Sequence, residues 1–221
     1  MELYEAMRTT FAAREFTGET VPDEVLYEVF ENARFAPSGG NRQGNRVIVV
    51  RAANTRNALA ELAEPAIKRY VAQINAGENP WNSITPTQVS DETVANTEAP
   101  ARLVSVFRNA DVALVFVVDL SVVASMDQYL DRVGVISGAS IYPFVWNVLL
   151  GIRQAGFGGT ITTFAVANEP QIKALLGIPE HFAVATVVPV GKPVKQLTRL
   201  KRRAVAEIAT RERFDGESLI V

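Results

Sequence analysis

The loop Ser38–Gln43, which reads SGGNRQ, has residue types that can bind a flat or anionic ligand. Glycine lets the backbone approach a ligand closely. Asn and Gln side chains present donor and acceptor groups in one plane. The loop therefore suits a flat heterocycle or a phosphate. The same residues also suit an ordinary turn between a helix and a strand.

A second glycine loop, Gly156–Thr160, reads GFGGT. It is not a complete GxGxxG nucleotide fingerprint, because Ile161 occupies the last glycine position and the loop follows a helix rather than a strand. The Gly191-Lys192 pair precedes Pro193 instead of the Ser or Thr of a P-loop. Taken alone, Gly156–Thr160 is more typical of a helix cap than of a ligand contact.

Cationic residues cluster at residues 199–203, which read RLKRR. Arginine can bind a phosphate group bidentately, so the cluster is a candidate phosphate site. Arg8 and Arg14 are similar candidates. Any one of these cations, taken alone, is more typical of a solvated surface.

The chain's own side chains are poor in catalytic groups. It has no cysteine, which excludes disulfides, thiolate nucleophiles and cysteine-ligated metal centres. Its single histidine, His181, excludes a histidine-rich metal site. The sequence contains no metal motif and no GxSxG nucleophile motif. If the protein is an enzyme, we expect a bound cofactor to carry the chemistry.

Length and composition predict a folded, slightly acidic protein. The 221 residues suffice for one large domain or two small ones. The net charge of −2 argues against a protein that wraps nucleic acid. No segment resembles a signal peptide, and no apolar run reaches ~18 residues, so we expect no membrane span. The absence of cysteine is compatible with a cytoplasmic location.

Hydrophobic periodicity predicts an α+β fold with one sheet. The predicted helices cover residues 2–13, 22–36, 54–76, 133–155 and 169–176, with a short one at 124–130. The predicted strands cover residues 47–51, 111–119 and 182–190. The middle strand is apolar on both faces, as a central strand should be, and the helix at 133–155 is expected to be buried all round. Helices and strands do not alternate regularly, which argues against a doubly wound sheet.

Two segments lack a regular pattern. Residues 77–100 contain three prolines, many Ser, Thr and Asn residues, and the isolated aromatic Trp81. Irregular segments of this length within a domain are commonly lids or binding loops. We therefore expect a flexible flap with a short helix or two. The tail at residues 195–221 carries the basic cluster.

Several of these segments together resemble the nitroreductase family of FMN-dependent enzymes. The family's N-terminal pattern is matched, in order and spacing, by Arg14–Phe16 (REF), Val21–Glu24 (VPDE) and Ala33–Gln43 (ARFAPSGGNRQ). Later matches are Trp146–Leu150 (WNVLL), Gly156–Thr160, Leu175–Pro179 (LLGIP) and Val190–Pro193 (VGKP). The resemblance covers nearly the whole chain, and residues 77–100 match least.

This resemblance implies a single α+β domain over residues 1–221, with a mainly antiparallel sheet flanked by helices. It implies an intertwined homodimer that binds FMN without a covalent bond. NADH or NADPH is the implied electron donor, and a nitroaromatic, quinone or related small molecule is the implied acceptor. Turnover is implied to be ping-pong, with hydride transfer through flavin N5 and no catalytic side chain. Neither nucleic acid nor a membrane is an expected partner.

The resemblance also implies roles for individual residues. Arg14 corresponds to the cation near flavin N1 and O2, where its charge favours the anionic reduced flavin. Gly158 and Gly159 correspond to the turn that faces the N5 edge. The flavin-contacting loop, in many members across the dimer interface, is represented by Ser38, Gly39, Asn41 and Gln43. The phosphate cations are represented by Arg202, then by Lys201 and Arg199. Trp81 is expected to influence the choice of acceptor by stacking on an aromatic substrate.

The sequence departs from the family pattern at two places. Thr10-Phe11-Ala12 stands where many members have Arg-Arg-Ser, which removes a phosphate cation and a hydroxyl. Gly44-Asn45 stands where an aromatic residue is usual. Either Arg8 or the C-terminal cluster compensates, or FMN binds more weakly.

Other functions remain open on the sequence alone. The same fold could support another flavin reaction, such as dehalogenation, azoline oxidation or flavin fragmentation. The missing Arg-Arg-Ser run favours a flavin-binding or flavin-free protein without turnover.

Overall fold

The computed structural model describes residues 1–220 and contains a four-stranded sheet. The strands are β1 (Asn45–Val50), β2 (Val112–Asp119), β3 (Gly158–Gly159) and β4 (Phe182–Gly191), in the spatial order β1-β2-β4-β3. Every neighbouring pair is antiparallel. The structure thus confirms the α+β class, and the three predicted strands correspond to β1, β2 and β4.

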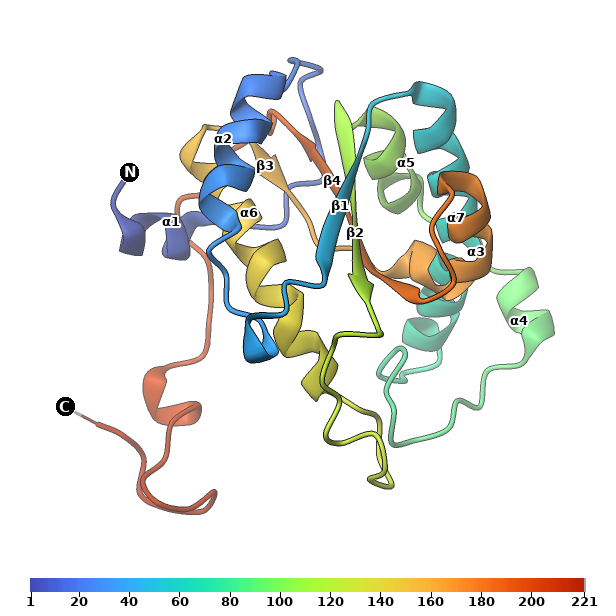
Figure 1. Cartoon of the computed structure of the whole chain (residues 1–221). Coiled ribbons are helices and arrows are strands. Elements are labelled where there is room, and N and C mark those ends of the chain that lie inside the picture. The colour runs from blue at the N-terminus through green and yellow to red at the C-terminus, as the bar shows by residue number, and fades with distance from the viewer. Residues whose placement is uncertain (221) are drawn as a thin grey trace.

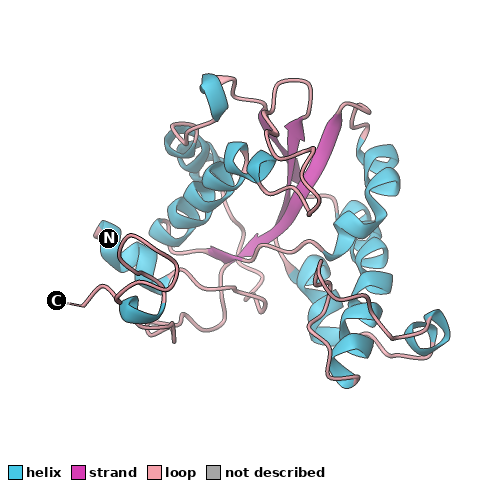
Figure 2. Cartoon of the chain, turned by 90° about the horizontal axis from the view of Figure 1, so that it is seen from below, coloured by secondary structure: helices cyan, strands magenta, loops and turns pink. Residues whose placement is uncertain are grey.

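Helices cover both faces of this sheet (Figures 1 and 2). One face packs against α2 (Asp23–Ala33) and α6 (Tyr142–Gln154). The other packs against α3 (Ala53–Asn75), α5 (Ala101–Asn109) and α7 (Glu169–Leu176). Within residues 1–220, no helix combines the length and the apolar character that a bilayer crossing requires.

Strand β2 joins the two cores because successive side chains of a strand point to opposite faces. Val112, Leu114, Phe116 and Val118 belong to the core beside α2 and α6. The residues between them, Ala113, Val115 and Val117, belong to the core beside α3, α5 and α7. Full burial of each large apolar side chain contributes ~1.5–3 kcal/mol. The predicted central strand therefore contributes buried side chains to both cores.

The structure corrects the predicted helices between residues 124 and 155. Helix α6 begins only at Tyr142, and a separate 3₁₀ turn covers Ile136–Ser140. A proline in the first turn, Pro143, favours a helix start at this point. Helix α6 is not buried all round, because Tyr142 and Trp146 are exposed. No helix forms at residues 124–130, which are turns and bends.

Other boundaries also differ from the prediction. Helix α1 (Leu3–Thr9) ends before residue 13, because Thr10 is extended and its hydroxyl donates to the Ala6 carbonyl over 2.7 Å. Helix α2 ends at Ala33, before the predicted residue 36. The unpredicted α5 begins directly after Pro100. Gly158–Gly159, expected as a turn, forms β3 because it pairs with the end of β4.

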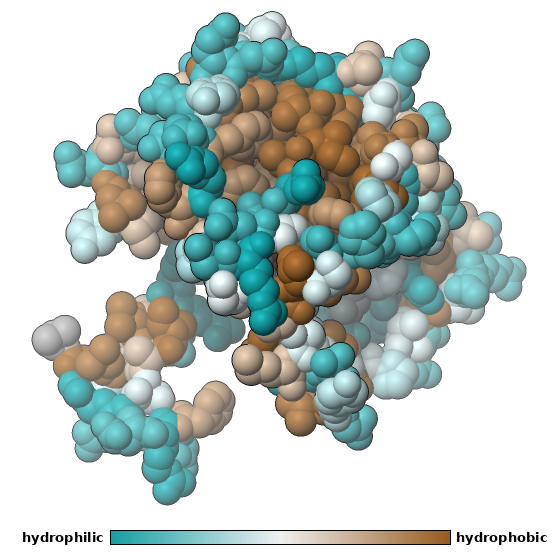
Figure 3. All heavy atoms as spheres, viewed as in Figure 1, coloured by the Kyte–Doolittle hydropathy of each residue, from teal (hydrophilic) through white to brown (hydrophobic). Residues whose placement is uncertain are grey.

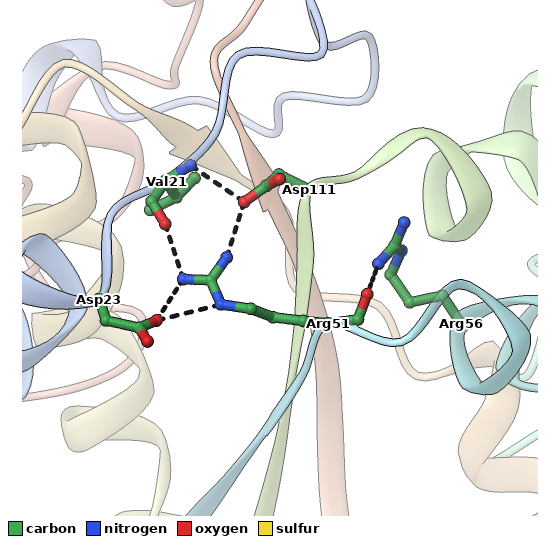
Figure 4. A network of polar contacts seen from close by, with 5 residues as sticks. All are labelled: Val21, Asp23, Arg51, Arg56 and Asp111. Atoms are coloured by element: carbon green, nitrogen blue, oxygen red, sulfur yellow. Dashed lines mark hydrogen bonds and ion pairs between the residues drawn. The ribbon is translucent and has the colours of Figure 1, made fainter.

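An ion-pair network at Arg51 ties the start of α2 to the sheet (Figure 4). The guanidinium of Arg51 donates to Asp111 over 2.9 Å, to Asp23 over 2.5 Å and to the Val21 carbonyl over 2.6 Å. The same Asp111 oxygen accepts from the Val21 backbone N–H over 2.9 Å. Arg56 in turn donates to the Arg51 carbonyl. Apart from the Arg56 contact, the bonds of this network join residues that are 28 to 90 positions apart in the sequence.

We expect Arg51→Met to lower the free energy of unfolding by ~1–3 kcal/mol, because it leaves the half-buried Asp111 carboxylate with one donor. Urea denaturation of the purified protein measures this change. Arg102→Met, on the exposed side of α5, is the matched control and should change the free energy little. Equal stability of the two variants would contradict the stabilising role of the network.

Candidate functional site

A cavity of about 550 Å³ lies between α3, α5 and the segment that follows β3. Its walls are mainly apolar and aromatic. Tyr70 of α3 meets Phe164 edge-on, with ring centroids 5.4 Å apart. The remaining lining residues are Arg14, Ala66, Pro80, Trp81, Leu103, Val106, Thr160, Ile161, Thr162, Thr163, Val166 and Ala167. The cavity can therefore accept a flat aromatic ligand.

Arg14 is the one charged residue that lines this cavity in the described part of the chain. Three threonines line it as well, and the hydroxyl of Thr162 is buried without a hydrogen-bond partner in residues 1–220. Such an orphaned hydroxyl costs free energy unless it finds a partner. The cavity is thus complementary to a flat ligand that carries polar or anionic groups on one edge.

The backbone on both sides of Arg14 is fastened to the sheet. The Ala13 N–H donates to the Gly159 carbonyl over 3.1 Å, and the Thr17 N–H donates to the Lys192 carbonyl over 2.9 Å. Gly158 permits this crossing, because a Cβ there would lie 2.9 Å from the Cβ of Ala13. Residues 12–17 therefore cross the end of the sheet as an extra extended segment, and Arg14 is held at the cavity.

The structure places three of the sequence-predicted elements together. Arg14 and Trp81 both line the cavity, and so do the residues that directly follow Gly158 and Gly159. Both glycines are buried and pack against other chain segments, so they have a structural role in addition to the predicted one.

The loop Ser38–Gln43 lies elsewhere and does not line the cavity. Within the loop, the Ser38 hydroxyl accepts from the Gln43 N–H over 2.9 Å, and the hydroxyl of the distant Ser140 accepts from the Gly39 N–H over 3.2 Å. Asn41 and Gln43 have φ values of 53° and 50°, which are uncommon for residues other than glycine. Such strained positions are frequent in ligand-binding loops.

The basic cluster also lies outside the cavity lining. Arg199, Lys201 and Arg202 are exposed in the tail, which leaves the body of the molecule at the lower left of Figure 1. The tail is anchored just before them, because Gln196 donates to the Thr9 carbonyl over 3.1 Å. The other candidate cation, Arg8, is exposed at the end of α1.

The predicted site residues therefore lie at three separate places in one chain, namely the cavity, the Ser38–Gln43 loop and the tail. The cavity also contains residues that the sequence analysis missed, namely Tyr70, Thr162 and Phe164. Tyr70 lies in the helix predicted at residues 54–76, where nothing in the sequence singled it out. Thr162 and Phe164 lie where the chain forms an isolated β-bridge at Thr162 and a 3₁₀ turn over Phe164–Asn168, and neither gives a periodic signal in the sequence.

A buried carboxylate organises an exposed apolar loop at residues 120–136. Asp127 is only 3% exposed and accepts from the Val135 N–H and from Arg132, each over 2.7 Å. The Val135 hydrogen bond, followed by the Arg132 contact, lowers the pKa of Asp127 to about 2. Around it Met126, Tyr129 and Val133 are exposed.

Because the pKa of Asp127 is lower in the folded protein than its ordinary value of 3.8, its contribution to stability is present above pH ~4 and is lost as the pH falls towards ~2. We expect the unfolding free energy of the wild type to fall over this pH range, and that of Asp127→Asn to fall less. Thermal denaturation at pH 5, 4 and 3 measures the difference. Parallel pH profiles for the two proteins would contradict this role of Asp127.

Comparison with known proteins places this fold in the class of nitroreductase-like proteins. The model of the nitroreductase family matches residues 7–192, and the chain belongs to that family. The mouse protein named iodotyrosine deiodinase 1 is 23% identical over 218 residues, which is 94% of this chain and 68% of the relative.

Two solved structures have the same fold. One is the NADPH:FMN oxidoreductase from Vibrio harveyi complexed with NAD⁺, with a TM-score of 0.66, 19% identity and coverage of 96% of this chain and 77% of the other. The second is oxidised iodotyrosine deiodinase bound to FMN and 3-iodo-L-tyrosine, with a TM-score of 0.62, 19% identity and coverage of 92% and 96%.

Proposed function

We propose that this protein binds FMN and uses NADH or NADPH to reduce a nitroaromatic, quinone or related aromatic acceptor. The observation that carries the proposal is the single positive charge of Arg14 in a cavity with otherwise apolar, aromatic and hydroxyl-bearing walls. The family membership supports it, as do structural neighbours whose names include FMN.

The donor set of the cavity fits FMN. Tyr70, Phe164 and the aliphatic side chains give flat, water-excluding walls for the ring system. Arg14 and the unpartnered Thr162 hydroxyl supply hydrogen bonds for its polar edge. Bound FMN supplies a carrier of two electrons between the nicotinamide donor and the acceptor.

In this proposal, the chain's own residues bind and orient the cofactor. The guanidinium of Arg14 stabilises negative charge at the polar edge of the ring, and its effect is strengthened by the apolar surroundings. The aromatic walls keep water from the reacting face. The 199–203 cluster is proposed to hold the phosphate, because the segment 10–12 offers no cation and Thr10 is buried and bonded to Ala6.

We also propose that the functional unit is a homodimer. Large apolar side chains are exposed on α1, on the 120–136 loop and along the tail, including Leu3, Tyr4, Tyr129, Ile208 and Phe214. Figure 3 also shows apolar residues gathered over the centre of the face on which β1 lies. Contiguous exposed apolar surface marks interaction sites. A second copy would supply its own Ser38–Gln43 loop to the cavity.

Reductive dehalogenation of an aromatic substrate is the second candidate. The mouse relative, which aligns with 94% of this chain, favours it. In that reaction an aryl halide and NAD(P)H give the arene, NAD(P)⁺ and a halide ion. Release of iodide from 3-iodo-L-tyrosine, measured with a halide electrode, would separate this activity from quinone reduction.

The first test is the visible absorbance spectrum of the purified protein, followed by anaerobic addition of NADH and NADPH in turn. We expect flavin bands that bleach with at least one nucleotide. Bands that bleach with neither would contradict the proposed electron donor. A protein that stays colourless after incubation with FMN would contradict the cofactor and favour a protein without turnover.

A further inference from the structure

Trp81 is fixed at the cavity wall by contacts to its backbone and to its ring. Its φ of 56° lies in the left-handed region, which costs of the order of 1–3 kcal/mol for such a residue and persists only where surrounding contacts hold it. Its backbone N–H donates to Oε1 of Gln73 over 3.2 Å. The guanidinium of Arg69 lies over the indole, 5.6 Å from the ring centroid. Trp81 is 49% exposed and lines the cavity.

The anchors all come from the end of α3. Arg69 and Gln73 are four residues apart and therefore lie on the same side of the helix. Tyr70, between them, lines the cavity directly. The same two helical turns thus supply an aromatic wall and hold a second aromatic residue, Trp81, beside it.

Gln73 is itself locked in place by a carboxylate of the flap. It is only 5% exposed, and its Nε2 donates to Oε2 of Glu78 over 3.3 Å. Glu78 also accepts from the Thr87 hydroxyl and from the Gln88 N–H, each over 2.7 Å. The Thr87 hydroxyl and then the Gln88 N–H hold the pKa of Glu78 below its ordinary value. Glu78 is therefore charged at neutral pH and ties residues 87–88 back to α3.

We propose that Gln73 and Glu78 are positioning residues that determine the size of the aromatic acceptor by fixing Trp81 at the cavity wall. The inference rests on the proposed function and extends it to the flap. Neither residue lines the cavity, so each acts through Trp81 rather than on the substrate. The amide orientation of Gln73 is essential, because its oxygen must face Trp81 and its nitrogen must face Glu78.

This arrangement predicts a selective kinetic effect. A two-ring acceptor offers a larger aromatic face for stacking on Trp81 than a one-ring acceptor does, so the larger acceptor depends more on that contact. Loss of a positioned aromatic contact should therefore raise KM for the larger acceptor and leave kcat unchanged. General loosening of the protein would raise both KM values or lower kcat for both acceptors.

The test uses Gln73→Met, which removes both hydrogen bonds at similar side-chain length, and Glu78→Ala, which replaces a half-buried side chain and keeps the helix intact. With NAD(P)H saturating, we expect KM for 2-methyl-1,4-naphthoquinone to rise about tenfold, KM for 1,4-benzoquinone to change less than about twofold, and kcat to stay constant. Glu92→Ala, an exposed carboxylate of α4 (Asp91–Ala95), is the matched control.

A readout without flavin tests the positioning directly. Acrylamide quenching of tryptophan fluorescence is measured on the apoprotein for wild type, Gln73→Met and Glu78→Ala. Each is compared with the same protein carrying Trp81→Phe, which isolates the emission of Trp81 from that of Trp146. We expect Trp81 to be quenched more strongly in both variants and to be unchanged in Glu92→Ala.

The outcomes separate this inference from the proposed function. Equal quenching of Trp81 in all proteins, or equal changes in KM for both quinones, overturns the positioning role. A wild type that binds no FMN or reduces neither quinone overturns the proposed function. In that case the quenching result decides on its own whether Gln73 and Glu78 position Trp81.

Discussion

Arg14→Ala is expected to weaken FMN binding by about 10- to 100-fold, because a hydrogen bond to a charged group contributes ~1.5–3 kcal/mol. Turnover at saturating FMN should fall as well, since no other charged side chain lines the cavity in residues 1–220. Fluorescence titration with FMN measures the first effect, and NAD(P)H oxidation with a quinone acceptor measures the second.

Two further variants make this prediction specific. Arg14→Lys keeps the charge but loses the planar fork of donors, so its FMN affinity should lie between those of wild type and Arg14→Ala. Arg108→Ala removes an exposed cation from the last turn of α5 and should change neither quantity. Wild-type affinity and turnover in Arg14→Ala would contradict the role of Arg14 in the proposed function.

The core of the fold was predictable because its signals are local. The apolar run of β2 and the glycine that ends α7, Gly177 with φ of 65°, follow from residue type alone. The secondary-structure predictions were wrong where tertiary contacts determine the local structure. Gly158–Gly159 becomes a strand only because Gly191 and Val190 pair with it. Residues 124–130 form turns because the Asp127 carboxylate collects backbone N–H groups from residues 135 and 136.

The site was predictable only in part for the same reason. Arg14 and Trp81 were selected from sequence, and the structure brings both to one cavity. Thr162 and Phe164 reach that cavity through a bridge between Thr162 and Val187 and through the 3₁₀ turn that follows it. No periodicity marks such contacts. The anchoring of Trp81 by Gln73 likewise depends on a left-handed backbone that its residue type does not suggest.

Removal of residues 205–221 is expected to convert a dimer of twice 24.1 kDa into a monomer, as measured by light scattering after gel filtration. The segment carries Val205, Ile208 and Phe214, all highly exposed in the single chain, with Phe214 at 101%. Burial of each such side chain against a partner contributes up to ~1.5–3 kcal/mol. The truncated protein keeps the basic cluster at 199–203, so the loss of phosphate cations is not the cause of any change.

The same truncation tests where the complete cofactor site is formed. If the partner's tail brings two copies together, the monomer should also bind FMN more weakly, because the strained Ser38–Gln43 loop does not line the cavity of its own chain. The full-length double variant Ile208→Ser with Phe214→Ser should behave like the truncation, and Glu217→Ala like the wild type. A monomer with unchanged FMN affinity would contradict a shared site, since Arg14 and its own walls would then suffice. A truncated protein that remains a dimer would instead assign the interface to α1 and the 120–136 loop.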